Sequence, residues 1–241
     1  MSYLKYHNDD FLNVSRGLVR GCSVRNIFGY NSAIGTTFIA AWEEATQYVY
    51  PTANTTMGIK SSVGADNPTV FVNGLDSDYN IITESITLNG TANTALSTQF
   101  FRINDLVITQ GNANGAIELV DDSNIYAKIR AGEGRNQASI FTVPANHSFH
   151  LNRIDAFCAS ASLNNRTLAF RNFLQNDGTG TSFRVAETEF LEQMHINRKY
   201  PFRYGEKNDI QFQLKGSSGT QFIGVFGEGV LIDESTNGLR S

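Results

Sequence analysis

The side chains that could do chemistry are few, and the histidines come first. His147 and His150 are three residues apart in ANHSFHL. On a helix this spacing would place both imidazoles on one face, as a metal site requires. The surrounding residues favour a strand instead, where residues three apart point to opposite sides. The spacing therefore predicts no joint metal site.

A second candidate is the acidic segment DSDYN. Asp76, Asp78 and Asn80 match positions 1, 3 and 5 of a calcium-binding loop. The match then ends, because Ile81 stands where glycine is needed and Thr87 stands where a bidentate glutamate is needed. Asp and Asn are also common turn residues, so the segment predicts a hairpin turn.

Paired carboxylates and glycine-rich loops give no catalytic signature. Glu187 and Glu189 would share one face of a strand, but nothing nearby in the sequence would shift either pKa. AGEGRNQ is not followed by a helix, so it predicts a turn and not a dinucleotide site. No nucleophile elbow, phosphate loop or zinc-protease motif is present. We expect no enzyme, no catalytic residues and no cofactor.

The elements that would position any site are strands. From residue 36 onward, about twelve strand-like segments recur between Gly, Asn, Asp and Ser turns. They include TTFIAAW, TVFVNG, QFFRINDLVITQ and DIQFQLKG. This spacing predicts an all-β, antiparallel, jelly-roll-like sandwich. A jelly roll needs about eight strands, so the surplus predicts a decorated sandwich or two fused ones.

Other elements are short or irregular. Residues 40–49 and 187–195 are the only segments with a helical alternative. GVFGEGV places Gly224, Gly227 and Gly229 within one strand, which indicates close backbone approach or a bulge. We expect a β-sandwich over residues 36–241; if two sandwiches are fused, their boundary would lie near residues 140–150.

The first 35 residues form a separate case. SRGLVRGCSVRNIFGY shows neither a helical period nor clean alternation, and glycines interrupt it. Its apolar side chains favour an extended N-terminal arm that becomes ordered against a neighbouring subunit. The interface residues predicted in this arm are Phe11, Leu12, Val19, Ile27, Phe28 and Tyr30.

Composition and charge exclude several partners. The 241 residues carry a formal net charge of −4 with dispersed Lys and Arg, which argues against nucleic acid as a partner. No apolar run approaches the length of a membrane helix, so we expect no membrane partner and synthesis in the cytoplasm. Cys22 and Cys158 are far apart in sequence and predict free thiols.

Three stretches carry a resemblance to a known group. They are TVFVNGLDSDYNIITESITLNG with FFRINDLVI, then IYAKIRAGEGRNQASIFTVPANHSFHL, and finally PFRYGEKNDIQFQL. These stretches resemble virion structural proteins of tailed bacteriophages, of the marine and cyanobacterial type. In that group Gly-Lys commonly follows TVPA, whereas this chain has Asn146 and His147.

The resemblance implies a particle component made in the host bacterial cytoplasm. Among such roles we favour a head decoration or cement protein that contacts the major capsid protein and forms a homo-oligomer, with a trimer favoured. Phe100 and Phe101 join the predicted interface, because one of two adjacent strand residues faces outward.

Two alternatives stay open. One is a tail adaptor, nozzle or fibre-attachment subunit. The other is a glycan-binding sandwich, in which Trp42, Tyr48 and Tyr50 would stack on sugar rings.

Overall fold

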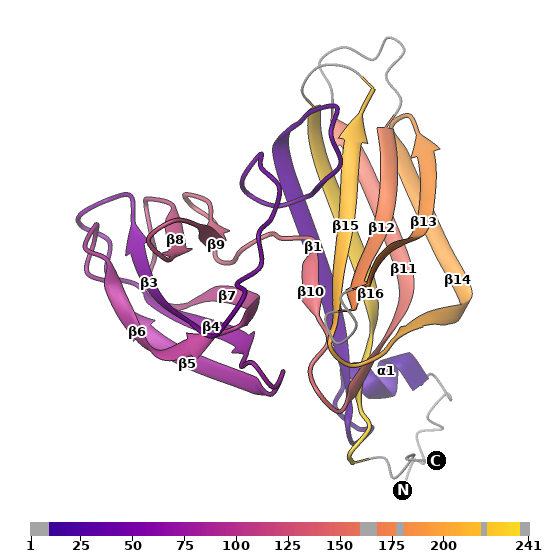
Figure 1. Ribbon diagram of the computed structural model, residues 1–241, viewed down its shortest axis with the longest axis horizontal. Coiled ribbons are helices and arrows are strands. Elements are labelled where there is room, and N and C mark those ends of the chain that lie inside the picture. Colours follow the sequence, from indigo (N-terminus) through magenta and orange to yellow (C-terminus); the bar gives the residue numbers. More distant parts are fainter. Residues whose placement is uncertain (1–9, 160–167, 177–180, 218–220, 237–241) are drawn as a thin grey trace, which may run out of the picture.

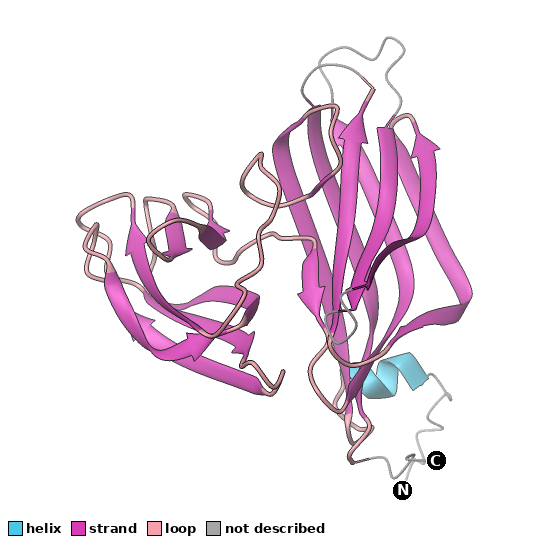
Figure 2. Ribbon diagram, viewed as in Figure 1, coloured by secondary structure: helices cyan, strands magenta, loops and turns pink. Residues whose placement is uncertain are grey.

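The computed structural model describes residues 10–159, 168–176, 181–217 and 221–236. Figures 1 and 2 show two β-structures side by side, a tall sandwich and a smaller lobe. The described part contains one helix, α1 (Asp10–Ser15). An all-β fold with antiparallel sheets is therefore confirmed.

The sandwich consists of two sheets. Sheet A has the strand order β1-β16-β11-β14, and sheet B has the order β10-β15-β12-β13, with β2 also paired to β15. The strands of sheet A are β1 (Cys22–Ile34), β16 (Gln221–Asp233), β11 (His147–Ala159) and β14 (Gln193–Tyr204). Those of sheet B are β2 (Ile39–Ala40), β10 (Ile140–Thr142), β15 (Asn208–Gly216), β12 (Leu168–Asn176) and β13 (Thr181–Phe190).

This strand order is that of a jelly roll. β2 and β10 pair with successive parts of β15, so together they take one edge position and leave eight strand positions in the described sandwich. Alternate residues of the two sheets meet between them in one apolar core, as a two-layer sandwich requires. β15 is buried along nearly its whole length because it lies in the middle of sheet B.

The smaller lobe is an insertion between β2 and β10. Its two sheets have the orders β6-β3-β8-β9 and β5-β4-β7, and they enclose a second apolar core. The strands are β3 (Thr55–Ser61), β4 (Thr69–Leu75), β5 (Ile81–Thr87), β6 (Thr94–Phe100), β7 (Arg102–Gln110), β8 (Ile117–Val120) and β9 (Ile125–Ile129). The chain thus leaves the sandwich partway along one strand position and returns to it.

A buried ion pair joins the lobe to the sandwich. Arg102 in β7 donates two hydrogen bonds of 2.9 Å, from Nε and Nη2, to the two carboxylate oxygens of Asp209 in β15. Both side chains are almost fully buried. The guanidinium also lies 4.0 Å from the ring centroid of Phe101 and 4.6 Å from that of Tyr50. Burial alone would lower the pKa of Arg102, but Asp209 outweighs it, and the pKa lies above its usual value.

Further polar contacts connect the two parts. Asn104 in β7 donates to Thr142 O and accepts from Thr142 N–H, both at 2.9 Å, and Arg25 in β1 pairs with Asp105 in β7. Because these contacts are short and largely buried, they fix the lobe against the sandwich.

Part of the predicted arm is a strand. Cys22–Ile34 forms β1 and pairs with β16 over most of its length, so the prediction of an arm over residues 1–35 is wrong for this segment. The strand alternation of β1 is not visible in the sequence, because Gly29 takes a position that faces the core and has no apolar side chain to mark it. A Cβ at Gly29 would overlap Ser139 and the carbonyl of Ala41. Residues 1–9 lie outside the described part.

Two other expectations need correction. A single boundary near residues 140–150 does not fit an insertion whose two ends adjoin β2 and β10. The helical alternatives are wrong as well, because residues 40–49 contain no helix and residues 187–195 span the end of β13 and the start of β14. Among the described residues, no helix has the length and apolarity needed to cross a bilayer.

The prediction of a hairpin turn at DSDYN is confirmed. The turn joins β4 to β5, and the Asp76 carboxylate accepts hydrogen bonds of 2.9 Å from the backbone N–H groups of Asp78 and Asn80. Tyr79 has a φ of 67°, a conformation that the turn requires. The acidic side chain therefore serves the turn itself.

A candidate docking surface on the jelly roll

The outer surface of sheet A carries a group of aromatic side chains. In β16, Ile223 and Val225 point into the core, so Phe222 and Phe226 point outward. The register places Phe28 of β1 opposite Phe226. Together with two further rings on the same surface, these residues form what we call the aromatic face: Phe28, Tyr30, Phe157, Phe222 and Phe226.

The rings of the aromatic face are fitted to the strands beneath them. Phe157 of β11 and Tyr30 of β1 both lie opposite Gly224 of β16. A Cβ at Gly224 would overlap the ring of Phe157, so glycine is what allows this ring to lie across the middle strand. Phe28 and Phe226 pack with ring centroids 4.9 Å apart.

These rings are accessible to a partner. Phe157 is 55% exposed, Phe222 is 50% exposed and Phe28 is 36% exposed. Single exposed apolar residues are normal on a protein surface, but several on adjacent strands mark a site of interaction. The arrangement is suited to burying apolar surface against another protein.

Charged residues surround the aromatic face. The guanidinium of Arg130 lies 3.9 Å from the ring centroid of Tyr30, and that of Arg135 lies 5.5 Å from the centroid of Phe28. On the other side, Asp155 pairs with Arg153 at 2.6 Å and with His195 at 2.9 Å. An apolar centre with a polar rim is the usual anatomy of a protein–protein interface.

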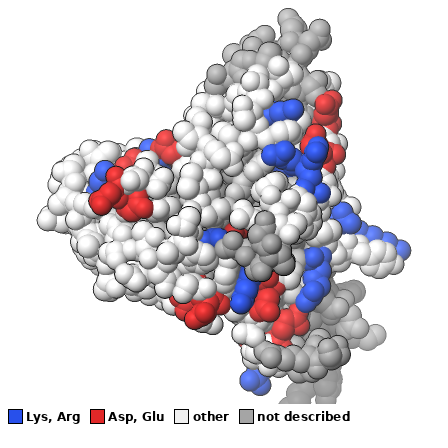
Figure 3. All heavy atoms as spheres, in the orientation of Figure 1, with Lys and Arg blue, Asp and Glu red and all other residues white. Residues whose placement is uncertain are grey.

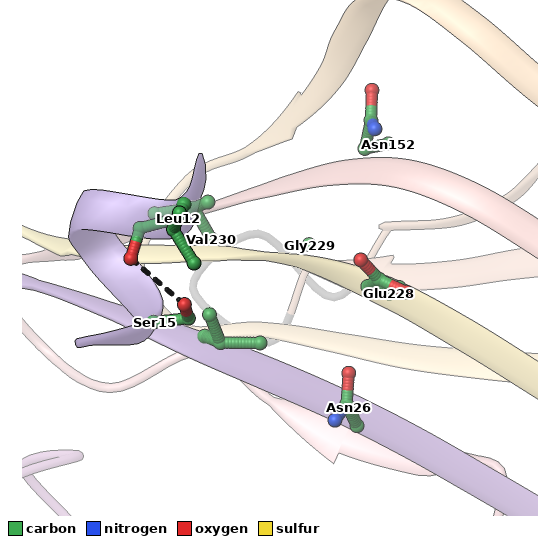
Figure 4. Close-up of a pocket in the computed structure, with 8 residues that line it drawn as sticks. Leu12, Ser15, Asn26, Asn152, Glu228, Gly229 and Val230 are labelled. Atoms are coloured by element: carbon green, nitrogen blue, oxygen red, sulfur yellow. Dashed lines mark hydrogen bonds between the residues drawn. The ribbon is translucent and has the colours of Figure 1, made fainter. Parts of the chain in front are cut away.

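A cleft continues the same surface along β16. It has a volume of about 380 Å³ and lies between α1 and sheet A. Figure 4 shows Leu12 and Ser15 from the helix, with Asn26, Asn152 and Glu228 around the opening. The buried Oδ1 of Asn26 accepts no hydrogen bond from the described residues, so a partner could supply the donor.

Three of the six interface residues predicted in the arm lie on the proposed docking surface. Phe28 and Tyr30 belong to the aromatic face, and Leu12 lines the cleft. Ile27 is buried in the core of the sandwich and cannot contact a partner. Val19 is partly buried in the turn before β1. Phe11 lies in α1, and its side chain is outside the described part.

The prediction that Phe100 and Phe101 take part in an interface needs correction. Both are buried, although only one was expected to face the core. Phe100 fills the core of the lobe, and Phe101 packs edge-on against Tyr79 with ring centroids 5.5 Å apart. The outward position of Phe101 is therefore covered by the junction between lobe and sandwich.

Sequence reasoning missed Phe157, Phe222 and Phe226. The signal was the glycine spacing of β16, for which close backbone approach was predicted and is confirmed. Gly224 lies under the ring of Phe157, and Gly227 lies against the ring of Phe212. Which rings lie over these glycines depends on how the strands pair and how the two sheets pack, and the sequence does not reveal either.

The residues considered for chemistry have structural partners. Ser148 is buried, and its hydroxyl contacts His150 Nε2 at 3.0 Å and donates to Glu234. Burial and the charge of Arg203 lower the pKa of His150. Here the serine lies between the acid and the histidine, whereas a catalytic triad needs the histidine in the middle.

Within the described residues, no group of three or more His, Cys, Asp or Glu side chains could hold a metal ion. Cys22 and Cys158 are both partly buried, and the Cys158 thiol donates to Gln221 Oε1 at 3.3 Å. Glu187 pairs with Arg184 at 2.7 Å.

Comparison with known proteins adds little to this description. No protein-family model and no curated protein matches the chain. Two solved structures of infectious bursal disease virus were found, a VP2 subviral particle and the Gt strain. Each is 11% identical to this chain, and each match covers 90% of this chain. The matches cover 73% and 74% of the two viral chains, with TM-scores of 0.24 and 0.23, respectively. A likeness at this score carries no argument about function.

Proposed function

We propose that this chain is a structural subunit of a bacteriophage particle, and that it is a decoration or cement protein of the head. The observation that carries the proposal is the aromatic face, an accessible apolar surface with a charged rim on the outside of sheet A. The jelly-roll strand order agrees with this role, because viral capsid domains often use that fold. Fold alone does not fix function, so the surface is the main support.

The mechanism would be stabilisation by binding. A protein that binds the assembled shell and not the separated subunits shifts the equilibrium toward the shell. The aromatic face would supply the apolar area, and its rim of Arg130, Arg135 and Asp155 would set the orientation. The major capsid protein is the partner we propose, and the virion is the location.

Binding of the purified chain to heads that lack it tests this proposal. We expect co-sedimentation of the wild-type chain and about tenfold or greater weakening for Phe157→Ser combined with Phe222→Ser, because buried aromatics dominate interface energies. The matched control is Val49→Ser with Ile81→Ser, which changes two apolar residues of similar exposure away from the face.

Two outcomes would count against the proposal. If the wild-type chain does not sediment with heads, the head role is wrong; binding to isolated tails instead would support the tail alternative. If the variant Phe157→Ser with Phe222→Ser binds as tightly as the control variant and the wild type, the aromatic face is not the docking surface. Thermal melts of each variant show whether it is folded.

The glycan-binding alternative loses the residues on which it rested. Trp42 and Tyr48 are buried, with ring centroids 5.2 Å apart. Tyr50 lies against Arg102 at the junction and accepts from Gln211. These three rings cannot stack on a sugar without opening the junction.

A further inference from the structure

The cleft beside α1 contains a carboxylate without a partner. Glu228 of β16 is partly buried and lines the cleft, and its side chain forms no ion pair or hydrogen bond with the described residues. Many other carboxylates lie beside a cation. Figure 3 shows acidic and basic side chains close together over the face of the molecule that it draws. A partly buried charge that lacks a partner favours the binding of a donor.

Two amide side chains lie next to this carboxylate. Asn26 of β1 is opposite Glu228 in the strand register, and its buried Oδ1 accepts no hydrogen bond from the described residues. Asn152 is the extra residue of a bulge, at the point where β11 shifts its register against β16. Figure 4 shows the three side chains in a row on one side of the cleft. Three adjacent strands therefore bring hydrogen-bond acceptors to one place.

The nearest cation in the register is engaged elsewhere. Arg153 of β11 lies opposite Glu228, but its guanidinium pairs with Asp155 at 2.6 Å. Among the described residues that line the cleft, none is Lys, Arg or His. The charges of Arg153 and Asp155 offset each other, so Glu228 leaves the site with one uncompensated negative charge.

The remaining walls of the cleft are apolar. They are formed by Leu12 of α1, Val24 of β1 and Val230 of β16. Leu12 is 52% exposed and Val24 is 39% exposed, so these walls are open to a partner. Apolar walls beside a row of acceptors suit a side chain with a long hydrocarbon stem and a cationic head.

The cleft is continuous with the aromatic face. Asn26 and Glu228 lie two residues along their strands from Phe28 and Phe226, which is a distance of about 7 Å on the same outer surface. A subunit that covers the aromatic face can therefore reach into the cleft with one side chain.

We propose that the cleft receives an arginine side chain from the neighbouring particle subunit. The guanidinium would donate to Glu228 and Asn26 at the same time, because it carries five N–H donors in a planar fork. Lysine has three donors at a single point and matches the row of acceptors less well. The hydrocarbon stem would lie along Leu12 and Val230. This inference rests on the proposed function, because it names the chemistry of the partner that binds there.

A titration of the purified chain tests the site without the particle. The probes are N-acetyl-arginine amide and N-acetyl-citrulline amide, which have similar shapes but differ in charge. We expect the arginine probe to shift the NMR signals of Asn26 and Val230 with a dissociation constant on the order of 10 mM, as for a small fragment. The citrulline probe should bind several-fold more weakly, because it lacks the charge that Glu228 attracts.

A matched pair of variants assigns the effect to Glu228. Glu228→Gln keeps the shape of the side chain and removes its charge, so the arginine probe should then bind no better than the citrulline probe. The control is Glu189→Gln, which neutralises an exposed glutamate of β13 in the other sheet and should bind both probes like the wild type. On heads that lack the chain, Glu228→Gln should bind about tenfold more weakly than Glu189→Gln.

Several results would overturn the inference. If neither probe shifts the cleft signals at about 100 mM, or if both shift them equally, the cleft does not select a guanidinium. Equal binding of N-acetyl-lysine amide would contradict the choice of arginine. Glu228→Gln that sediments with heads as well as Glu189→Gln excludes the cleft from the contact. A wild-type chain that does not sediment with heads contradicts the proposed function instead, and the titration still shows whether the cleft binds a guanidinium.

Discussion

At the scale of single residues, Arg102 has the most demanding position. It is a fully buried cation that meets Asp209 through two parallel hydrogen bonds and lies over the ring of Phe101. Thr142 donates to the same carboxylate at 2.5 Å. Removing either charge leaves the other buried without its partner, which costs more than the pair itself contributes.

Replacement of Arg102 by methionine should therefore lower the free energy of unfolding by about 3–5 kcal/mol. The double variant Arg102→Met with Asp209→Leu should recover a large part of the loss, because neither charge is then stranded. Urea denaturation measures both. The control is Arg153→Met, which breaks an exposed pair with Asp155 and should cost about 0–1 kcal/mol. Equal losses for Arg102→Met and Arg153→Met would contradict this account.

Glu43 is the second buried charge at the junction. Its Oε1 accepts from the backbone N–H of Gln137, and its buried Oε2 accepts no hydrogen bond from the described residues. Burial raises the pKa of Glu43 from 4.5 to about 7, although the Gln137 N–H and the charge of Arg130 act against it.

The contribution of Glu43 to the free energy of unfolding should therefore fall as the pH rises. The folded state holds the Glu43 proton more tightly than the unfolded state, so the contribution is complete below pH 4.5 and is lost as pH rises to about 7. The gap between these values corresponds to about 3 kcal/mol. Glu43→Gln should remove this dependence, so that its stability relative to wild type increases from pH 5 to 8. Glu133→Gln, at an exposed carboxylate, should follow the wild type. A constant difference between Glu43→Gln and wild type would exclude a raised pKa.

Single residues also show what sequence reasoning could reach. Phe28 and Tyr30 were expected at an interface because apolar residues in a polar segment need cover, and they lie on the aromatic face. Phe101 was expected outside because strand residues alternate. A lobe packed against the sandwich reversed that expectation, and alternation within one strand contains no information about such a neighbour.

At the scale of elements, β1 determines which truncations the chain tolerates. From the sequence, deletion of residues 1–30 should leave a folded sandwich and remove only an arm. The structure predicts otherwise, because this deletion removes nine residues of β1, including the buried Ile27, and exposes the edge of β16. Among the described residues, deletion of residues 1–20 removes α1 and most of the turn that follows it, and it leaves β1 intact.

The shorter deletion should keep a cooperative thermal transition close to that of the full chain, whereas the longer one should unfold or aggregate. Thermal melts followed by circular dichroism compare them directly. A cooperative transition in the chain lacking residues 1–30, at an unchanged temperature, would show that β1 is not needed for the sandwich.

Elements also explain why the fold was predicted only in outline. Strand spacing and turn residues predict many antiparallel strands, and that part is confirmed. The insertion could not be predicted, because β2 and β10 have two and three residues and are about a hundred positions apart in the chain. Their identity as one edge depends on pairing with β15, a contact between segments far apart in sequence.

At the scale of the whole molecule, the two parts act as one body with distinct surfaces. The junction fixes the lobe against the sandwich, and the aromatic face lies on the outside of sheet A. Arg130 and Arg135, which follow the last strand of the lobe, lie against Tyr30 and Phe28 of this face. The proposed contact with heads therefore uses side chains from both parts of the molecule.

The central claim is that the chain works by binding other particle subunits through the aromatic face. An image of the phage particle at side-chain resolution tests it most directly. We predict that the chain is present on the head, with Phe157 and Phe222 in van der Waals contact with a neighbouring subunit and shielded from solvent. A particle in which the chain is absent, or present with both rings facing solvent, would contradict the account.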